Sequence, residues 1–62
     1  MKQRELREKA RELLGISEEA ATEYAMERCY HGKSHIEGLV AAFERYPNDA
    51  RLAEVLGLAK KN

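Results

Sequence analysis

The clearest helix signal in the sequence lies in residues 34–43, which read SHIEGLVAAF. Ser34 followed three residues later by Glu37 is a capping box, in which each side chain accepts a hydrogen bond from the backbone amide of the other residue. Apolar side chains then recur at the spacing i, i+3, i+4 and i+7 of one helix face, at Ile36, Leu39, Val40 and Phe43. These two signals predict an amphipathic helix that begins at His35.

The same helix is expected to end at Tyr46, because Pro47 has no amide hydrogen and disfavours helical backbone in the residue before it. Its apolar stripe is the strongest in the chain, so we expect this helix to lie at the centre of the fold. Phe43 is then expected to be the most buried aromatic side chain.

Helix signals on either side of this segment divide the rest of the chain into short pieces. Gly15 suits the left-handed position that ends a helix, and Ser17 suits the N-cap of the helix that follows. Gly32 is expected to end that second helix. Asn48 or Asp49 can cap the last helix. The expected helices span approximately residues 2–14, 18–31, 35–46 and 49–59.

Each flanking helix also has an apolar face. The expected core positions are Leu6, Ala10, Leu13 and Leu14 in the first helix, Thr22, Ala25, Met26 and Cys29 with Ala21 beside them in the second, and Leu52, Val55, Leu56 and Ala59 in the last. Short loops favour neighbouring, roughly antiparallel helices. The sequence therefore predicts an all-α fold, a single domain over residues 1–62 that forms a small bundle of three to four short helices.

The chain has no net charge to attract a charged partner, since 11 basic and 11 acidic residues cancel. A nucleic-acid-binding domain usually carries a basic patch or stripe. Locally, residues 1–14 hold five basic and three acidic side chains, whereas residues 15–30 hold one basic and four acidic ones. These two segments are therefore expected to attract each other as neighbours in the fold.

Cys29, His31 and His35 lie within seven residues and come closest to a metal or nucleophilic site. Structural zinc needs four ligands and catalytic zinc needs three with a water, and no CxxC or HExxH spacing supports either. Cys29 lies in an apolar stripe, where a thiol is not activated. A thin core also leaves little room for a substrate pocket. We therefore expect no metal, no cofactor and no catalysis, and interpret the three residues as a core cysteine and two helix-end histidines.

Aromatic and apolar side chains left over from the core are the best candidates for a partner surface. Tyrosine is common in binding hot spots because it combines a large apolar area with a polar tip. Tyr24 lies among Glu23, Glu27 and Arg28 and is expected to be the hardest tyrosine to bury. The candidate partner-binding residues, all on the second and third helices, are Tyr24, Met26, Tyr30, Leu39 and Tyr46.

These features favour a small helical protein–protein interaction module or a homo-oligomerising bundle, which binds a protein partner or its own copy. Two alternatives remain open. One is a designed or redesigned helical scaffold without biological activity. The other is a helix-turn-helix-like nucleic-acid-binding domain, because residues 52–58 (LAEVLGL) resemble the first helix of that motif; the zero net charge makes a nucleic acid the less favoured partner.

The lone Cys29 cannot form an internal disulfide, which favours a reducing compartment. No apolar run approaches the roughly 18 residues that a membrane-spanning helix needs. We therefore expect a cytoplasmic protein that does not bind a membrane.

Overall fold

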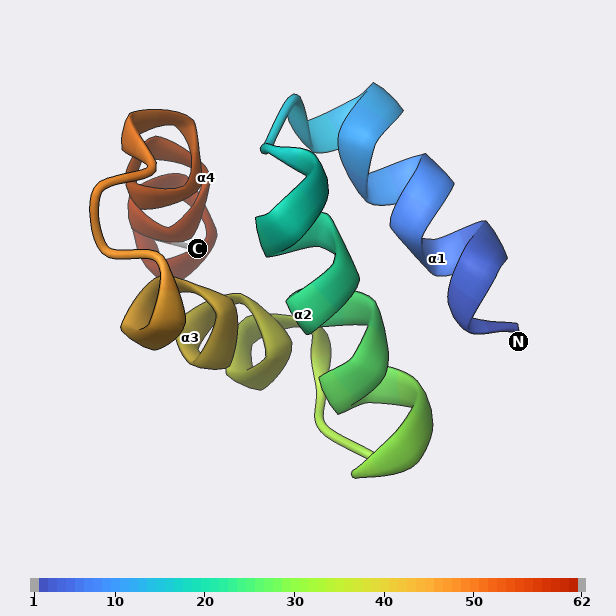
Figure 1. Ribbon diagram of the computed structural model, residues 1–62. Helices are drawn as coiled ribbons and strands as arrows, with labels where there is room; N and C mark the ends of the chain where they lie inside the picture. The colour runs from blue at the N-terminus through green and yellow to red at the C-terminus, as the bar shows by residue number, and fades with distance from the viewer. Residues whose placement is uncertain (1, 62) are drawn as a thin grey trace.

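The computed structural model describes the backbone of residues 2–61 and the side chains of residues 2–59 (Figure 1). Within these residues there is no strand, and none of the helices is long and apolar enough to cross a bilayer. The helices are α1 (Gln3–Lys9), η1 (Ala10–Leu14), α2 (Glu18–Tyr30), α3 (His35–Arg45) and α4 (Ala50–Lys61). Since η1 is a π-helical turn that continues α1, the predicted all-α bundle of short helices is confirmed.

The central helix of the bundle is α2. Figure 1 shows α1 on one side of α2 and α3 on the other, while α4 packs against α3 and contacts η1. The side chains of α2 are small where its neighbours approach, and Ala20, Ala21 and Ala25 are fully buried. The prediction that the helix over residues 35–46 lies at the centre is therefore wrong, because these alanines let helices pack closely around α2 instead.

The side chains predicted to cap α2 and α3 do so. At the start of α2, Ser17 Oγ accepts a hydrogen bond of 3.2 Å from the Ala20 amide. At the start of α3, the Glu37 amide donates to Ser34 Oγ at 3.3 Å, and the Ser34 amide donates to Glu37 Oε1 at 2.9 Å. The backbone hydrogen bond from Ser34 lowers the pKa of the Glu37 carboxyl. The predicted capping box is confirmed.

The first turn of α4 is fastened to the loop between η1 and α2. Asp49 caps α4, with Oδ1 accepting a hydrogen bond of 3.0 Å from the Leu52 amide. Its other oxygen, Oδ2, accepts a hydrogen bond of 3.3 Å from the Ser17 amide. Nearby, Arg51 Nε donates to the Leu14 carbonyl at 2.6 Å. We call these two long-range contacts, Asp49–Ser17 and Arg51–Leu14, the α4 clamp.

The end of the first helix differs from the expectation. At Ala10, α1 changes into the π turn η1, and a π turn takes more residues than an α turn. This change shifts the following side chains around the helix. Leu13, expected in the core, is 75% exposed, and Ile16 from the next loop is buried instead. Gly15 (φ 70°) has the left-handed backbone predicted for it, and Gly32 (φ 63°), which was expected to end the second helix, has the same backbone.

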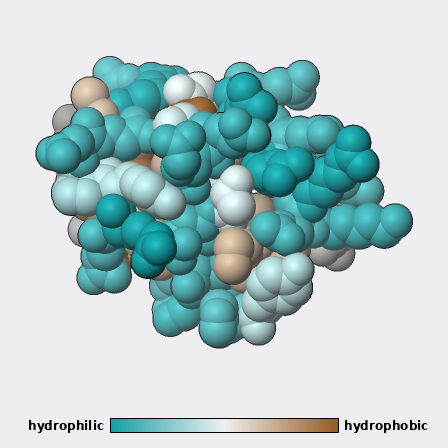
Figure 2. Space-filling view, viewed as in Figure 1, coloured by the Kyte–Doolittle hydropathy of each residue, from teal (hydrophilic) through white to brown (hydrophobic). Residues whose placement is uncertain are grey.

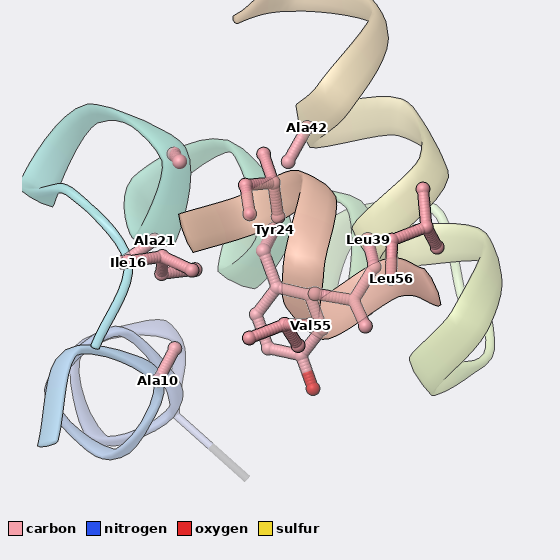
Figure 3. Close-up of a cluster of buried hydrophobic side chains, with 10 residues drawn as sticks. Ala10, Ile16, Ala21, Tyr24, Leu39, Ala42, Val55 and Leu56 are labelled. Atoms are coloured by element: carbon pink, nitrogen blue, oxygen red, sulfur yellow. The ribbon is translucent and has the colours of Figure 1, made fainter. Parts of the chain in front are cut away.

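The buried faces of α2 and α3 are rotated from those expected. Met26 and Ile36 are exposed, and Phe43 is only partly buried. Tyr24, expected to resist burial, is only 4% exposed and is the most buried aromatic side chain. Figure 3 shows its ring among the buried side chains of the core. The predictions for Phe43 and Tyr24 are thus wrong.

Small residues on α3 explain this rotation. The side of α3 that faces the core carries Gly38, Leu39 and Ala42, all buried, and Gly38 leaves room for the ring of Tyr24. Two helices pack closely where the side chains between them are small. On α3 this close approach decides which face is buried, and it outweighs burial of the larger apolar stripe that includes Ile36 and Phe43. The face predicted for the last helix is confirmed by Leu52, Val55 and Leu56, which are buried, and by the partly buried Ala59.

Candidate functional site

A small groove lies where α1 and η1 face Tyr24 of α2 and His35 of α3. It is lined by Leu6, Lys9, Ala10, Leu13, Leu14, Tyr24 and His35 and is called the Leu13 groove below. Its volume of about 180 Å³ falls below the roughly 300–1,000 Å³ of small-molecule and cofactor sites. It is close to the roughly 150 Å³ of an apolar cavity that can hold benzene. The groove therefore has room for one large apolar side chain.

Three side chains are hydrogen-bonded in a row at the Tyr24 side of this groove. Arg28 Nη1 donates to the Tyr24 hydroxyl at 3.1 Å, and that hydroxyl lies 2.9 Å from Nδ1 of His35. The rings of Tyr24 and His35 meet edge to face with their centroids 5.7 Å apart. The Arg28 guanidinium carbon also lies 5.8 Å from the centroid of the Tyr24 ring.

These contacts explain how a tyrosine among charged residues is buried. A buried hydroxyl needs a hydrogen-bond partner, and Tyr24 has two. The guanidinium of Arg28 lies over the ring and also reaches the hydroxyl, so the charge of Arg28 does not oppose burial. In Figure 3 the hydroxyl oxygen lies at the edge of the cluster of buried side chains.

The polar groups of the Leu13 groove are all hydrogen-bond donors or groups able to donate. Lys9 brings an ammonium, His35 an imidazole and Tyr24 a hydroxyl, and the residues that line the groove include no carboxylate. The other lining side chains are apolar. An occupant of matching chemistry combines an apolar group with a negative charge.

The five partner candidates named from the sequence do not form one surface. Tyr24 and Leu39 belong to the core and offer no exposed apolar surface, although Tyr24 borders the Leu13 groove. Tyr30 is 67% exposed at the far end of α2, where its hydroxyl donates to Gln3 Oε1 at 3.1 Å. Met26 and Tyr46 do come together, in a second groove described next.

This second groove, called the Met26 groove below, has a volume of about 430 Å³ and is lined by Glu18, Glu19, Thr22, Glu23, Met26, Arg45 and Tyr46. It is larger than the Leu13 groove and strongly acidic. Arg45 lies across it, with Nε 3.8 Å from Glu23 Oε1. The three glutamates keep this surface hydrated, which makes it the weaker of the two sites for an apolar group.

Sequence reasoning missed Leu13 and Lys9 as site residues. Leu13 was assigned to the core because its spacing from Leu6 fits an α-helix, and the π turn that breaks this spacing has no sequence signature. One signal was present: Leu13, Leu14 and Ile16 place three large apolar side chains within four residues. One short helix end cannot bury all three against the same neighbour.

The possible metal ligands are not brought together. Among the side chains that the structure describes, no group of three or more His, Cys, Asp or Glu residues is arranged to hold a metal ion. Nδ1 of His35 is engaged by Tyr24. Cys29 is partly buried on α2, and His31 follows the end of that helix.

Comparison of the chain with protein-family models, with curated proteins and with solved structures finds no significant match. A functional assignment therefore depends on the residues of this chain alone. On the face shown in Figure 2 the surface is mostly hydrophilic, with small hydrophobic patches between hydrophilic residues. The Leu13 groove is the most apolar of the concave surfaces described here.

Proposed function

We propose that this protein is a helical protein-interaction module whose Leu13 groove takes an apolar side chain from an acidic amphipathic helix of a partner protein. The observation that carries the proposal is Leu13, a large apolar side chain that is 75% exposed at the edge of an apolar groove. Burying such a side chain contributes about 1.5–3 kcal/mol. A partner that covers Leu13 therefore gains binding free energy that this chain alone leaves unused.

Charge selects the kind of partner. Lys9 and His35 stand at the groove without a carboxylate among the lining residues, so acidic side chains that flank the apolar anchor are favoured over basic ones. A helical partner suits the site, since a helix can place one apolar side chain in the groove and hold acidic side chains three or four residues away on the same face. The small volume argues against a cofactor or a drug-sized ligand in the same place.

The test uses two synthetic helical peptides with leucines at positions i and i+4. One carries glutamates beside the leucines, and the other carries lysines at the same positions. Binding is followed by fluorescence anisotropy of labelled peptide. We expect the glutamate peptide to bind more tightly than the lysine peptide, and the difference to shrink at high salt.

The matched variants are Leu13→Ser and Leu58→Ser. Both remove an exposed leucine, but Leu58 does not line the groove. Leu13→Ser is expected to weaken binding of the glutamate peptide by about tenfold or more, from the loss of apolar burial, whereas Leu58→Ser leaves it unchanged. The proposal fails if neither peptide binds or if both variants behave alike. It also fails in favour of a second copy as the occupant if the solution mass rises with concentration and Leu13→Ser abolishes the rise.

A further inference from the structure

The hydrogen-bond row at the Leu13 groove has a direction that follows from its chemistry. Arginine has donors only, so the Tyr24 oxygen must accept the hydrogen bond from Arg28. The hydroxyl hydrogen of Tyr24 then remains to be donated. The neighbour within reach is Nδ1 of His35, 2.9 Å away. In this arrangement Tyr24 accepts from Arg28 and donates to His35.

The opposite direction satisfies fewer groups. If His35 carried its hydrogen on Nδ1, the Tyr24 oxygen would receive two donors, and the Tyr24 hydrogen would lose the acceptor it has in His35. A hydroxyl hydrogen without an acceptor beside a nearly buried ring is costly. The tautomer of a neutral histidine is set by the hydrogen bond of its other nitrogen, so Nδ1 accepts and Nε2 carries the hydrogen.

We infer that the Arg28–Tyr24–His35 row holds the His35 imidazole as the Nε2–H tautomer, and that this N–H, together with the Lys9 ammonium, recognises a carboxylate beside the partner's apolar anchor. Nε2 lies on the edge of the ring away from Nδ1 and therefore away from Tyr24. His35 is exposed and lines the groove with Lys9. The inference rests on the proposed function. It names the chemical group of the partner that is recognised and the atoms of this protein that recognise it.

A carboxylate is the group that fits these atoms. It accepts hydrogen bonds and donates none, so it can pair with the His35 N–H and with the Lys9 ammonium at the same time. A carboxamide of the same size brings an NH₂ group that has no acceptor in this pair of donors. The site is thus expected to distinguish glutamate from glutamine at one position of the partner helix.

The first test needs no partner. A long-range ¹H–¹⁵N correlation spectrum of the whole protein, recorded at alkaline pH where imidazoles are neutral, separates protonated from unprotonated ring nitrogens. We expect His35 to show a protonated Nε2 and a bare Nδ1, while His31 shows the mixture typical of an unconstrained ring. A protonated Nδ1 in His35 overturns the inference, whether or not any peptide binds.

The second test uses Tyr24→Phe, with Tyr30→Phe as the matched control. Both remove a tyrosine hydroxyl, but the hydroxyl of Tyr30 bonds Gln3, and neither of these two residues lines the groove. Tyr24→Phe is expected to return the His35 spectrum to a tautomer mixture, and Tyr30→Phe to leave it unchanged. If Tyr24→Phe keeps the pure Nε2–H pattern, Tyr24 does not set the tautomer and the inference is wrong. If Tyr24→Phe does not fold, the wild-type spectrum still shows whether His35 is held as the Nε2–H tautomer.

The third test compares the glutamate peptide with a peptide in which the glutamate next to the leucine is replaced by glutamine. We expect binding of the glutamine peptide to be weaker by about tenfold or more, the loss of a hydrogen bond to a charged group. Equal binding of the two peptides overturns carboxylate recognition but leaves the interaction module in place. Failure of every peptide to bind overturns the proposed function instead, and the recognition step with it.

Discussion

A Cβ atom built on Gly38 would lie 3.0 Å from Cδ1 of Tyr24. It would also lie 3.1 Å from Cγ of Arg28, so two side chains of α2 that are hydrogen-bonded to each other pack against α3 at this glycine. The Tyr24 ring is held by the core on one side and by His35 at its hydroxyl, and it has little freedom to move away. The close approach of α2 and α3 therefore depends on the missing side chain.

Gly38→Ala is expected to lower the melting temperature by displacing Tyr24. Overpacking costs about 1–3 kcal/mol, which exceeds the 0.5–1 kcal/mol that alanine contributes in a helix. Gly57→Ala is the matched control, because Gly57 also lies inside a helix but has nothing within 4 Å of a built Cβ. It should stabilise the protein by about 0.5–1 kcal/mol. Thermal denaturation followed by circular dichroism measures both, and stabilisation by both substitutions would disprove the close contact.

Asp49→Ala should destabilise the protein by about 0.5–2 kcal/mol, because it removes the cap of α4 and the acceptor for the Ser17 amide. Asn48→Ala is the natural control, since the sequence offers Asn48 and Asp49 equally as caps and Asp49 provides the bond to Leu52. We expect a change within about 0.5 kcal/mol for Asn48→Ala. Urea denaturation gives both values, and a larger effect at Asn48 would contradict the assignment.

The same carboxylate gives a pH dependence of stability. Burial raises the pKa of Asp49, but hydrogen bonds from Leu52, Ser17 and Arg51 together outweigh it and leave the pKa below its ordinary value of 3.8. The charged form therefore stabilises the fold above that pH, and the contribution is lost as pH falls through the lowered folded value. The free energy of unfolding should fall below about pH 4, and less steeply in Asp49→Asn. Parallel curves for the two proteins would remove Asp49 as a cause.

Tyr24→Ala should cost more stability than Phe43→Ala. Truncating a fully packed large aromatic side chain costs about 3–5 kcal/mol, and Tyr24 is the buried one whereas Phe43 is only partly covered. Chemical denaturation measures the free energy of unfolding of both variants and shows which substitution costs more stability. If Phe43→Ala is the more damaging change, the core is centred on the stripe that the sequence favoured and not on Tyr24.

Helix ends were predictable from the sequence because they depend on neighbouring residues. Ser34 and Glu37 meet within one helical turn, and Gly15 adopts the backbone that few other residues tolerate. The face of α4 was predictable as well, since Leu52, Val55 and Leu56, three of its four large apolar residues, lie on one side.

The buried faces of α2 and α3 were not predictable in the same way. On α3, Leu39 belongs to two overlapping stripes, and the choice between them depends on Gly38 meeting Tyr24 of another helix. The Leu13 groove was hard to predict for the same reason, because its lining depends on contacts between different helices. The Tyr24–His35 contact joins two helices on either side of the turn at Gly32, and the exposed Leu13 lies in the π turn η1.

The α4 clamp also has a consequence for the order in which the chain folds. Asp49 and Ser17 are 32 residues apart in sequence, and Arg51 and Leu14 are 37 apart, whereas Tyr24 and His35 are separated by only 11. The entropic cost of closing a loop grows with its length, so contacts between α2 and α3 form at lower cost than the clamp. Closing of the clamp is then expected to be a late step of folding, after α4 has packed on its sequence neighbour α3. In the native protein the reverse motion opens the clamp while α2 and α3 stay paired, and the amide hydrogens of α4 should exchange with deuterium ahead of those of α2 and α3.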